Sequence, residues 1–230
     1  NRVFIFQSSG RLDFVIGETG FLVAPRALCF EDDATLLVVT KDRLVLRIAD
    51  ASPEECDTVA DLKTTTRTSQ LKSVSHVIKN RSGFMVLDPE LGQITQLDTL
   101  WTFVKTVIGH GHGVRGKVWE PTDLERDLAG KLIVADRGDF PVQVFATTGT
   151  PLFVADWNTP AGQQSWEATA VAVTRQEMIW VADSSNRRWR IYNQTGTLAE
   201  DWEFPSQVWR PSEASVTVDN RLVVVEERGL

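Results

Sequence analysis

Two stretches of the chain follow the same pattern: "GKLIVADRGDFPVQVFATTGTPLFVADW" (residues 130–157) and "EMIWVADSSNRRWRIYNQTGTLAEDW" (residues 177–202). Each contains an apolar strand, a turn that opens with Asp, an alternating strand, a Thr-Gly turn and a fourth short strand. A repeat of about 40 to 50 residues with four short strands is typical of a β-propeller blade. The two stretches therefore predict an all-β repeat protein.

The turn-opening position recurs along the whole chain at intervals of 44 to 48 residues. It is occupied by Thr40, Asp88, Asp136, Asp183 and Glu227. When the C-terminal "LVVVEERGL" is joined to the N-terminal "NRVFIFQSSGRLDFVIG", the pattern appears once more. One repeat is thus split between the two ends, as a ring of sheets requires, because closure leaves no strand edge open.

We therefore predict a single β-propeller domain over residues 1–230, with five four-stranded blades. The ring is closed by a blade that the N- and C-termini share. The approximate blades are 18–64, 65–108, 109–157, 158–204, and 205–230 together with 1–17. Six blades are the alternative.

Composition limits the class of protein. Hydrophobic residues make up 42% and charged residues 24% of the 230 residues, which is ordinary for a globular domain with a sizeable core. No apolar run approaches the roughly 20 residues that a membrane helix needs. We expect a soluble protein without membrane insertion, with the cytoplasm as the favoured compartment. Cys29 and Cys56 lie in an apolar run and an acidic loop, so no disulfide framework is expected.

Two stretches of the sequence resemble a known family: "GHGHGVRGKVWEPTDLERDLAGKLIVADRGDFPVQVF" (residues 109–145) and "VADSSNRRWRIYNQTG" (residues 181–196). They resemble the NHL family of propellers, whose pattern has a glycine-rich lead-in, a proline, Val-Ala-Asp, a polar turn, an arginine and an alternating strand. The resemblance extends over about 107–204 and the split repeat, and it is weak over 49–97. Family members commonly have six blades, which is the reason for the alternative above.

His110 and His112 lie in the glycine-rich lead-in, where glycine provides the turn conformations. The equivalent lead-ins contain no histidine, so we expect both to be solvated loop residues and not a metal site. The repeat-equivalent tryptophans are expected to pack in the core or between blades. They are Trp119, Trp166 and Trp209, and also Trp157 and Trp202.

In propellers of this kind, the first strand of each blade begins beside the central channel. In catalytic relatives, the residues at these strand starts form the active site. Those positions hold Arg26, His76, Thr122 with Asp123, Thr169, and Ser212 with Glu213. The amidating lyases, which the fold resembles, hold zinc with three histidines that follow the proline. Here threonine, serine and arginine follow the prolines, and zinc catalysis needs three protein ligands. We therefore expect no metal or cofactor and favour a non-catalytic protein, with a metal-dependent hydrolase or lyase as the alternative.

The turns that open with Asp or its equivalents are rich in charge of both signs, which suits selective contacts with another protein. Arg187, Arg188 and Arg190 form a tight basic cluster in the sequence, which Arg137 and Arg228 could join. Related tripartite-motif proteins bind RNA through a strongly positive form of this face. Here Asp136, Asp139 and Asp183 interrupt the arginines and the net charge is −7, so nucleic-acid binding is the second alternative.

The predicted function is therefore a scaffold that binds a protein partner of unknown identity through the charged face at the channel entrance, either alone or as a module of a larger protein or assembly. The candidate binding residues are Arg26, His76, Asp123, Arg137, Arg187, Arg188, Glu213 and Arg228.

Overall fold

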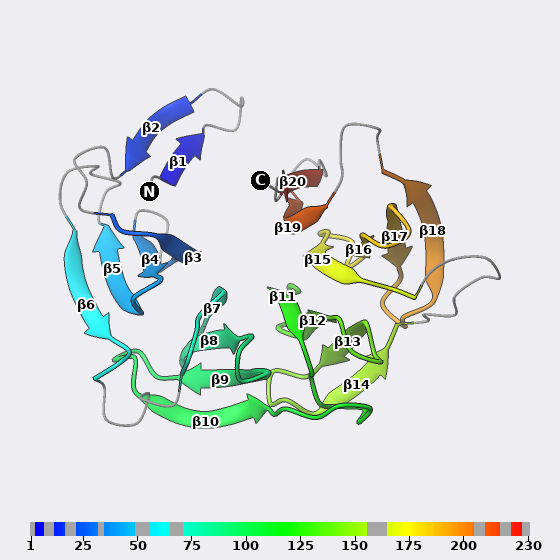
Figure 1. The fold of residues 1–230 in the computed structure, drawn as a ribbon, viewed down its shortest axis with the longest axis horizontal. Coiled ribbons are helices and arrows are strands. Elements are labelled where there is room, and N and C mark those ends of the chain that lie inside the picture. Colours follow the sequence, from blue (N-terminus) through cyan, green and yellow to red (C-terminus); the bar gives the residue numbers. More distant parts are fainter. Residues whose placement is uncertain are drawn as a thin grey trace. The chain divides into compact units, whose positions relative to one another are not determined.

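The computed structural model describes residues 3–6, 12–16, 22–31, 35–48, 56–64, 71–155, 165–204, 210–216 and 222–226. All regular structure within these ranges is β-strand, labelled β1 to β20 in Figure 1. None of the described residues belongs to a helix of the length and hydrophobicity that crossing a bilayer requires. The chain divides into two compact units, which are described separately below.

Unit 1 consists of Asn1–Leu91 and Thr95–Thr106. It contains a hairpin of β1 (Val3–Phe6) and β2 (Leu12–Ile16) and a sheet of β3 (Pro25–Phe30), β4 (Leu36–Thr40), β5 (Leu44–Ile48) and β6 (Asp57–Asp61). It also holds most of a second sheet, made by β7 (His76–Asn80), β8 (Gly83–Asp88), β9 (Gln93–Leu97) and β10 (Phe103–Ile108).

Unit 2 consists of Gly92–Ile94 and Val107–Leu230. Its first sheet contains β11 (Pro121–Arg126), β12 (Leu132–Asp136), β13 (Val142–Phe145) and β14 (Pro151–Val154). Its second sheet contains β15 (Ala168–Val173), β16 (Ile179–Asp183), β17 (Arg188–Tyr192) and β18 (Leu198–Glu203). A hairpin of β19 (Pro211–Val216) and β20 (Leu222–Glu226) follows.

Within each unit the sheets pack face to face in chain order. Because successive residues of a strand point to opposite faces, one strand can contribute side chains to the core on each side of its sheet. In unit 1, Leu36 of β4 lies in a core cluster with Ile16 of β2, and its neighbour Leu37 lies in a cluster with Phe84 of β8. The second strands are therefore buried on both faces and read as nearly continuous apolar runs. All five residues of β4 and all five of β12 are buried.

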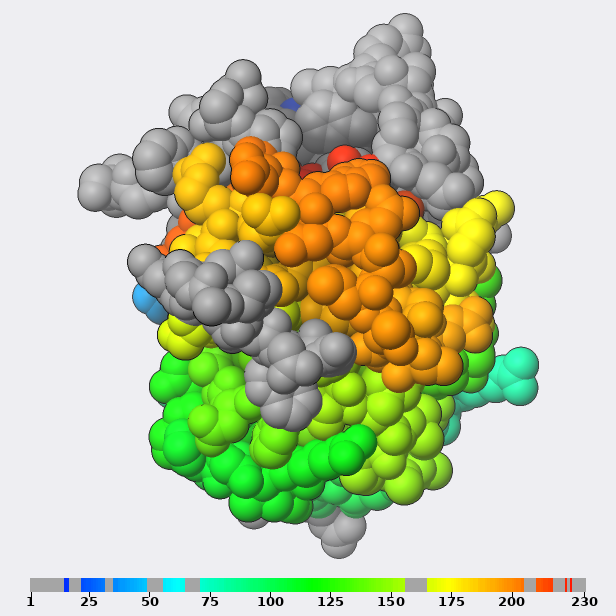
Figure 2. Space-filling view, turned by 90° about the vertical axis from the view of Figure 1, so that its right-hand side faces the viewer, coloured from blue at the N-terminus to red at the C-terminus, as the bar shows by residue number. Residues whose placement is uncertain are grey.

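The same alternation holds in unit 2. Ile179 of β16 shares a core cluster with Ile133 of β12, whereas Trp180 packs against the cluster that contains Ala214 of β19. Burial falls toward the last strand of a sheet. Five of the six residues of β18 are exposed and Asp201 is half-buried, and this strand lies at the surface in Figure 2 (orange).

Four of the five first strands have a β-bulge at their second residue, and β7 is the exception. The bulged residues are Arg26 in β3, Thr122 in β11, Thr169 in β15 and Ser212 in β19. In unit 2 the first strands β11, β15 and β19 are successive neighbours, and in unit 1 β3 lies beside β7. Bulges often redirect side chains next to functional sites.

A buried carboxylate ends the second strand of three sheets. Asp88, Asp136 and Asp183 are at most 2% exposed. Their oxygens accept hydrogen bonds from backbone amides of the segment that leads into the first strand and of the turn that follows. Asp136, for example, accepts from Trp119 N at 2.7 Å, Glu120 N at 3.1 Å and Gly138 N at 2.6 Å.

The lead-in segment needs these acceptors because it lies outside the strand ladder, where its buried amides would otherwise have no partner. Gly138 makes the close approach possible, since a Cβ there would lie 2.9 Å from Asp136 Oδ1. In the first sheet Thr40 replaces the acid and accepts from Leu44 N at 3.2 Å. We call this arrangement of Asp88, Asp136 and Asp183 the carboxylate latch.

The sequence analysis predicted four complete repeats, and each coincides with one four-stranded antiparallel sheet. The fifth repeat appears as two hairpins, β19–β20 and β1–β2, which belong to different units. The blade number, the closure of the ring and the single-domain organisation therefore stay predictions.

Candidate functional site: the turn face

We define the turn face of a sheet as the end where its first strand begins and where the turn between its second and third strands lies. Arg26, Asp123, Glu213 and the turn residues Arg137 and Arg187 all belong to this end of their sheets. Arg228 and Glu227 lie outside the described residues.

Asp123 holds two neighbouring strands together. It is 3% exposed, and its oxygens accept hydrogen bonds from Leu124 N at 2.7 Å and from Val171 N of β15 at 2.8 Å. Thr122 Oγ1 donates to Ala168 O of β15 at 2.9 Å. Both side chains therefore join the first strands of adjacent sheets, and the Asp123 carboxylate is directed at backbone amides.

Glu213 occupies the position equivalent to Asp123, yet it is exposed. His76 is half-buried and lies opposite Leu87, the residue before Asp88, so it too is equivalent to Asp123 and not to the bulged residues. Its Nδ1 lies 3.1 Å from Ser75 Oγ. These three predicted site residues thus share one register position and have three different environments.

Arg190 is buried inside unit 2, at 1% exposure. Its Nε and Nη2 donate to Asp183 Oδ2 at 3.3 and 3.2 Å, and its guanidinium lies 4.1 Å from the Trp166 ring centroid. The ion pair is fully removed from water. Arg190 therefore has a structural role in the core of unit 2.

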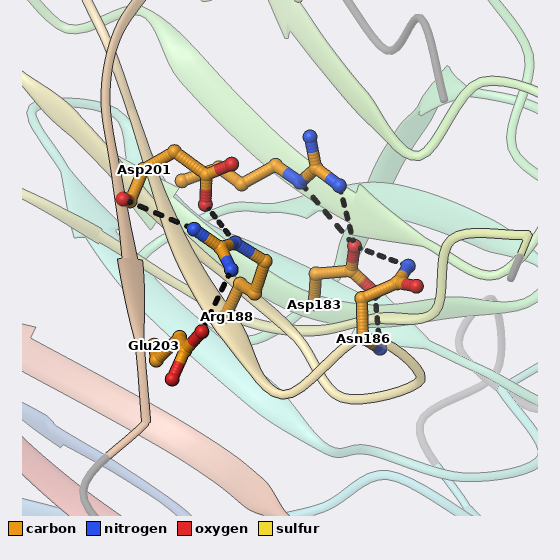
Figure 3. Close-up of polar contacts among 6 residues, drawn as sticks. Asp183, Asn186, Arg188, Asp201 and Glu203 are labelled. Atoms are coloured by element: carbon orange, nitrogen blue, oxygen red, sulfur yellow. Dashed lines mark hydrogen bonds and ion pairs between the residues drawn. The ribbon is translucent and has the colours of Figure 1, made fainter. Parts of the chain in front are cut away.

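Arg188 is paired with acids on the last strand, as Figure 3 shows. Its guanidinium hydrogen-bonds the Asp201 carboxylate and lies 3.4 Å from Glu203 Oε1. The hydrogen bond to Asp201 raises the pKa of Arg188 above its ordinary value. The predicted basic cluster of Arg187, Arg188 and Arg190 is therefore not a surface cluster, because Arg190 is buried against Asp183 and Arg188 is paired with acids of β18.

Glu167 contacts two other arginines, Arg137 and Arg210, and was not among the site residues predicted from the sequence. Arg137 Nε lies 3.3 Å and Arg210 Nη2 2.5 Å from its Oε1. Arg137 was predicted as a binding residue, and its charge is shared with this carboxylate. Glu167 is the repeat equivalent of Glu120 in the "WEATAV" and "WEPTDL" segments, which was the available signal.

Two of the acids that we expected among the surface arginines are inside the protein. Asp136 and Asp183 belong to the carboxylate latch, whereas Asp139 is exposed, with Oδ2 3.6 Å from His112 Nε2. Burial raises the pKa of Asp136 above its ordinary value, and the amides of Gly138, Trp119 and Glu120 oppose that rise. The turn face therefore exposes fewer acids than the sequence of its turns contains, because Asp136 and Asp183 are buried.

His110 and His112 are exposed loop residues, as expected. Their rings pack against Trp119, with centroid distances of 4.7 and 4.8 Å. Trp119 is 37% exposed, so its predicted role in the core or between blades is wrong: its ring is covered by the loop histidines.

Trp166 is 9% exposed and lies in the core, as predicted. Trp202 is 48% exposed and meets the edge of Trp180, because it lies on the exposed last strand. Trp157 and Trp209 lie outside the described residues.

Both cysteines are free thiols. Burial raises the pKa of Cys29 to about 12, so this thiol stays protonated at neutral pH and is a poor nucleophile. Within the described ranges, no three His, Cys, Asp or Glu side chains come together in a way that could hold a metal ion.

Comparison with known proteins identifies the fold. The structure matches virginiamycin B lyase from Staphylococcus aureus with a TM-score of 0.64 and 10% identity over 98% of this chain and 67% of that chain. It matches a streptogramin B lyase with a TM-score of 0.58 and 11% identity over 98% of this chain and 72% of that chain.

A structure of a nidogen/laminin complex gives a TM-score of 0.62 and 14% identity over 88% of this chain and 72% of that chain. No protein-family model and no curated protein matches the sequence. At these identities the likeness establishes a β-propeller-like fold alone.

We predict that two arginines of β17 differ strongly in their contribution to stability. Arg190→Leu should lower the free energy of unfolding by about 3 to 5 kcal/mol, because Asp183 would remain buried without its charge partner. Arg188→Leu should cost about 1 kcal/mol or less, since its acids are more accessible to water. Urea unfolding of both variants measures the difference, and equal costs would contradict the assigned roles.

Proposed function

We propose that this chain is a non-catalytic β-propeller of the NHL type that binds a protein partner through its turn face. The partner's identity is unknown, and the chain can act as one module of a larger assembly. The proposal rests on one observation above all: Asp123, the most buried of the predicted site residues, directs both carboxylate oxygens at backbone amides. A general acid or a metal ligand would need those oxygens for the substrate or the ion.

The exposed side chains of the turn face support a binding role. They carry charges of both signs: Arg26 at the bulge of β3, Arg137 in the β12–β13 turn and Glu213 beside the bulge of β19. A rigid set of sheets with a varied, mixed-charge edge suits recognition of one particular protein surface. The fold by itself does not assign this function.

We further propose that β19–β20 and β1–β2 are the two halves of a fifth blade. The register of each hairpin supports this assignment. In β1–β2 the register shifts between Ile5 and Phe6, as it does between Ile191 and Tyr192 in the third and fourth strands of the preceding sheet. In β19–β20 the shift follows Pro211, as in the first and second strands of other sheets. A shared blade of this kind would leave no strand edge open.

The shared blade predicts which residues of β20 and β1 face each other. By analogy with β16 and β17, where Trp180 pairs with Ile191, Val223 should pair with Ile5. In a Cys29→Ser/Cys56→Ser background, a Val223→Cys/Ile5→Cys variant should form an intramolecular disulfide on mild oxidation. Mass spectrometry of the oxidised monomer measures the bridge.

The control for this bridge is Val223→Cys/Phe4→Cys, in which a one-residue slip moves the two thiols to opposite faces. Absence of a bridge in the first variant, or equal bridging in both, would refute the shared blade.

The binding role predicts that partner binding depends on Arg187, in a turn of the turn face, and does not depend on Arg175, in a turn at the opposite end of the same sheet. Arg187 lies in the β16–β17 turn at φ 54°, a left-handed conformation that asparagine tolerates well. Arg187→Asn should therefore preserve the fold and abolish stoichiometric capture of the protein partner from native extract. The matched control is Arg175→Asn, in the exposed β15–β16 turn of the same sheet.

Quantitative affinity capture with the wild type and both variants measures how much of the partner each protein retains. If no protein is retained by the wild type, or if both variants retain it equally, the turn face of this sheet is not the binding surface.

A further inference from the structure

Three cations at the turn face of unit 1 have no acid partner among the residues that the structure describes. Arg26, Lys41 and Lys72 are exposed, and their side chains make no hydrogen bond or ion pair to any residue that the structure describes. This differs from unit 2, where Arg137, Arg188, Arg190 and Arg210 all contact carboxylates. Only Arg26 of these three was identified from the sequence.

Backbone contacts bring the three cations to one end of unit 1. Lys41 N donates to Ala24 O at 2.8 Å, which places the β4–β5 turn beside the bulge at Arg26. Arg43 of the same turn donates to Leu71 O, directly before Lys72. Since β3 also lies beside β7, these residues form one surface, which we call the basic patch (Arg26, Lys41 and Lys72).

The acids next to the basic patch are largely neutralised. Asp42 accepts a hydrogen bond from Lys63 Nζ at 3.1 Å. Asp88 is fully buried and accepts from Lys72 N at 2.6 Å and from Leu91 N at 3.1 Å, so its charge is turned toward the protein. Glu90 is exposed on the following turn. Among the described residues, positive charge therefore predominates at the patch, on a chain whose net charge is −7.

From this charge distribution we infer that the basic patch docks an acidic segment of a partner protein. The inference rests on the proposed binding function and names the chemistry that the partner brings. Carboxylates are complementary to unpaired lysine and arginine, and opposite surface potentials steer such encounters. A short acidic segment fits a patch of this size, whereas a long nucleic acid would extend past it onto a chain with an excess of acids.

Fluorescence anisotropy with labelled poly-L-glutamate as the probe tests the inference on the full chain. The wild type should bind at low salt, and binding should weaken as salt is added. The variant Arg26→Ser/Lys41→Ser/Lys72→Ser should bind at least about tenfold more weakly. Its urea unfolding should be nearly unchanged, because the three side chains are exposed and make no hydrogen bond or ion pair with any described residue.

The matched control is Lys105→Ser/Arg126→Ser/Arg175→Ser. It removes the same number of exposed positive charges from other elements and should bind poly-L-glutamate as the wild type does. Equal weakening in both variants would mean that net charge alone is responsible, and the inference would be wrong. It would also be wrong if the wild type failed to bind, or if a single-stranded RNA of equal charge bound more tightly at the same salt.

These outcomes are separate from the test of the proposed function. Capture of a protein partner through Arg187 can succeed while poly-L-glutamate fails to bind, in which case the partner is not acidic at this patch.

Discussion

Each lead-in segment must satisfy buried backbone amides that no neighbouring strand can reach. The carboxylate latch solves this problem, because one carboxylate offers about four acceptor positions, enough for the lead-in and the turn together. Asp136 bonds three amides in this way. In the three sheets that have it, the latch holds the lead-in beside the turn, at the end of the sheet where the first strand begins. Polar groups that look catalytic in the sequence are thus used to build the fold.

The need to satisfy the lead-in amides also determines which charged side chains are buried. Asp183 accepts from Glu167 N and also neutralises Arg190, which in turn covers Trp166. One buried carboxylate therefore connects the lead-in, the second strand and the third strand of a sheet. Cations of the turn face differ between the units: Arg137 and Arg210 of unit 2 contact Glu167, whereas the basic patch of unit 1 has no acid partner among the described residues.

The sequence predicted the features that depend on period and local pattern. The spacing of Thr40, Asp88, Asp136 and Asp183 located four sheets correctly, because an apolar run followed by a polar turn is a local signal. It could not distinguish Arg188 from Arg190. Both lie on β17 and have the same chemistry, and only the acids contributed by β16 and β18 determine which one is buried.

The candidate site was predicted less well for a related reason. Exposure depends on contacts between segments far apart in the chain, so Asp123 and Glu213 looked alike although one is buried and the other is exposed. Trp119 looked like a core residue because repetition does not reveal what covers a ring. Lys41 and Lys72 carried no signal, since the lack of a partner is a property of the folded protein.

Hydrogen exchange at the amides that the latch binds tests the central claim most directly. The amides of Trp119, Glu120 and Gly138 lie outside the strand ladder, yet the latch predicts that they exchange about as slowly as the central-strand amide of Val134. Exchange as fast as at the exposed loop residue Arg115 would contradict the claim, because the carboxylate would then not hold the lead-in in solution.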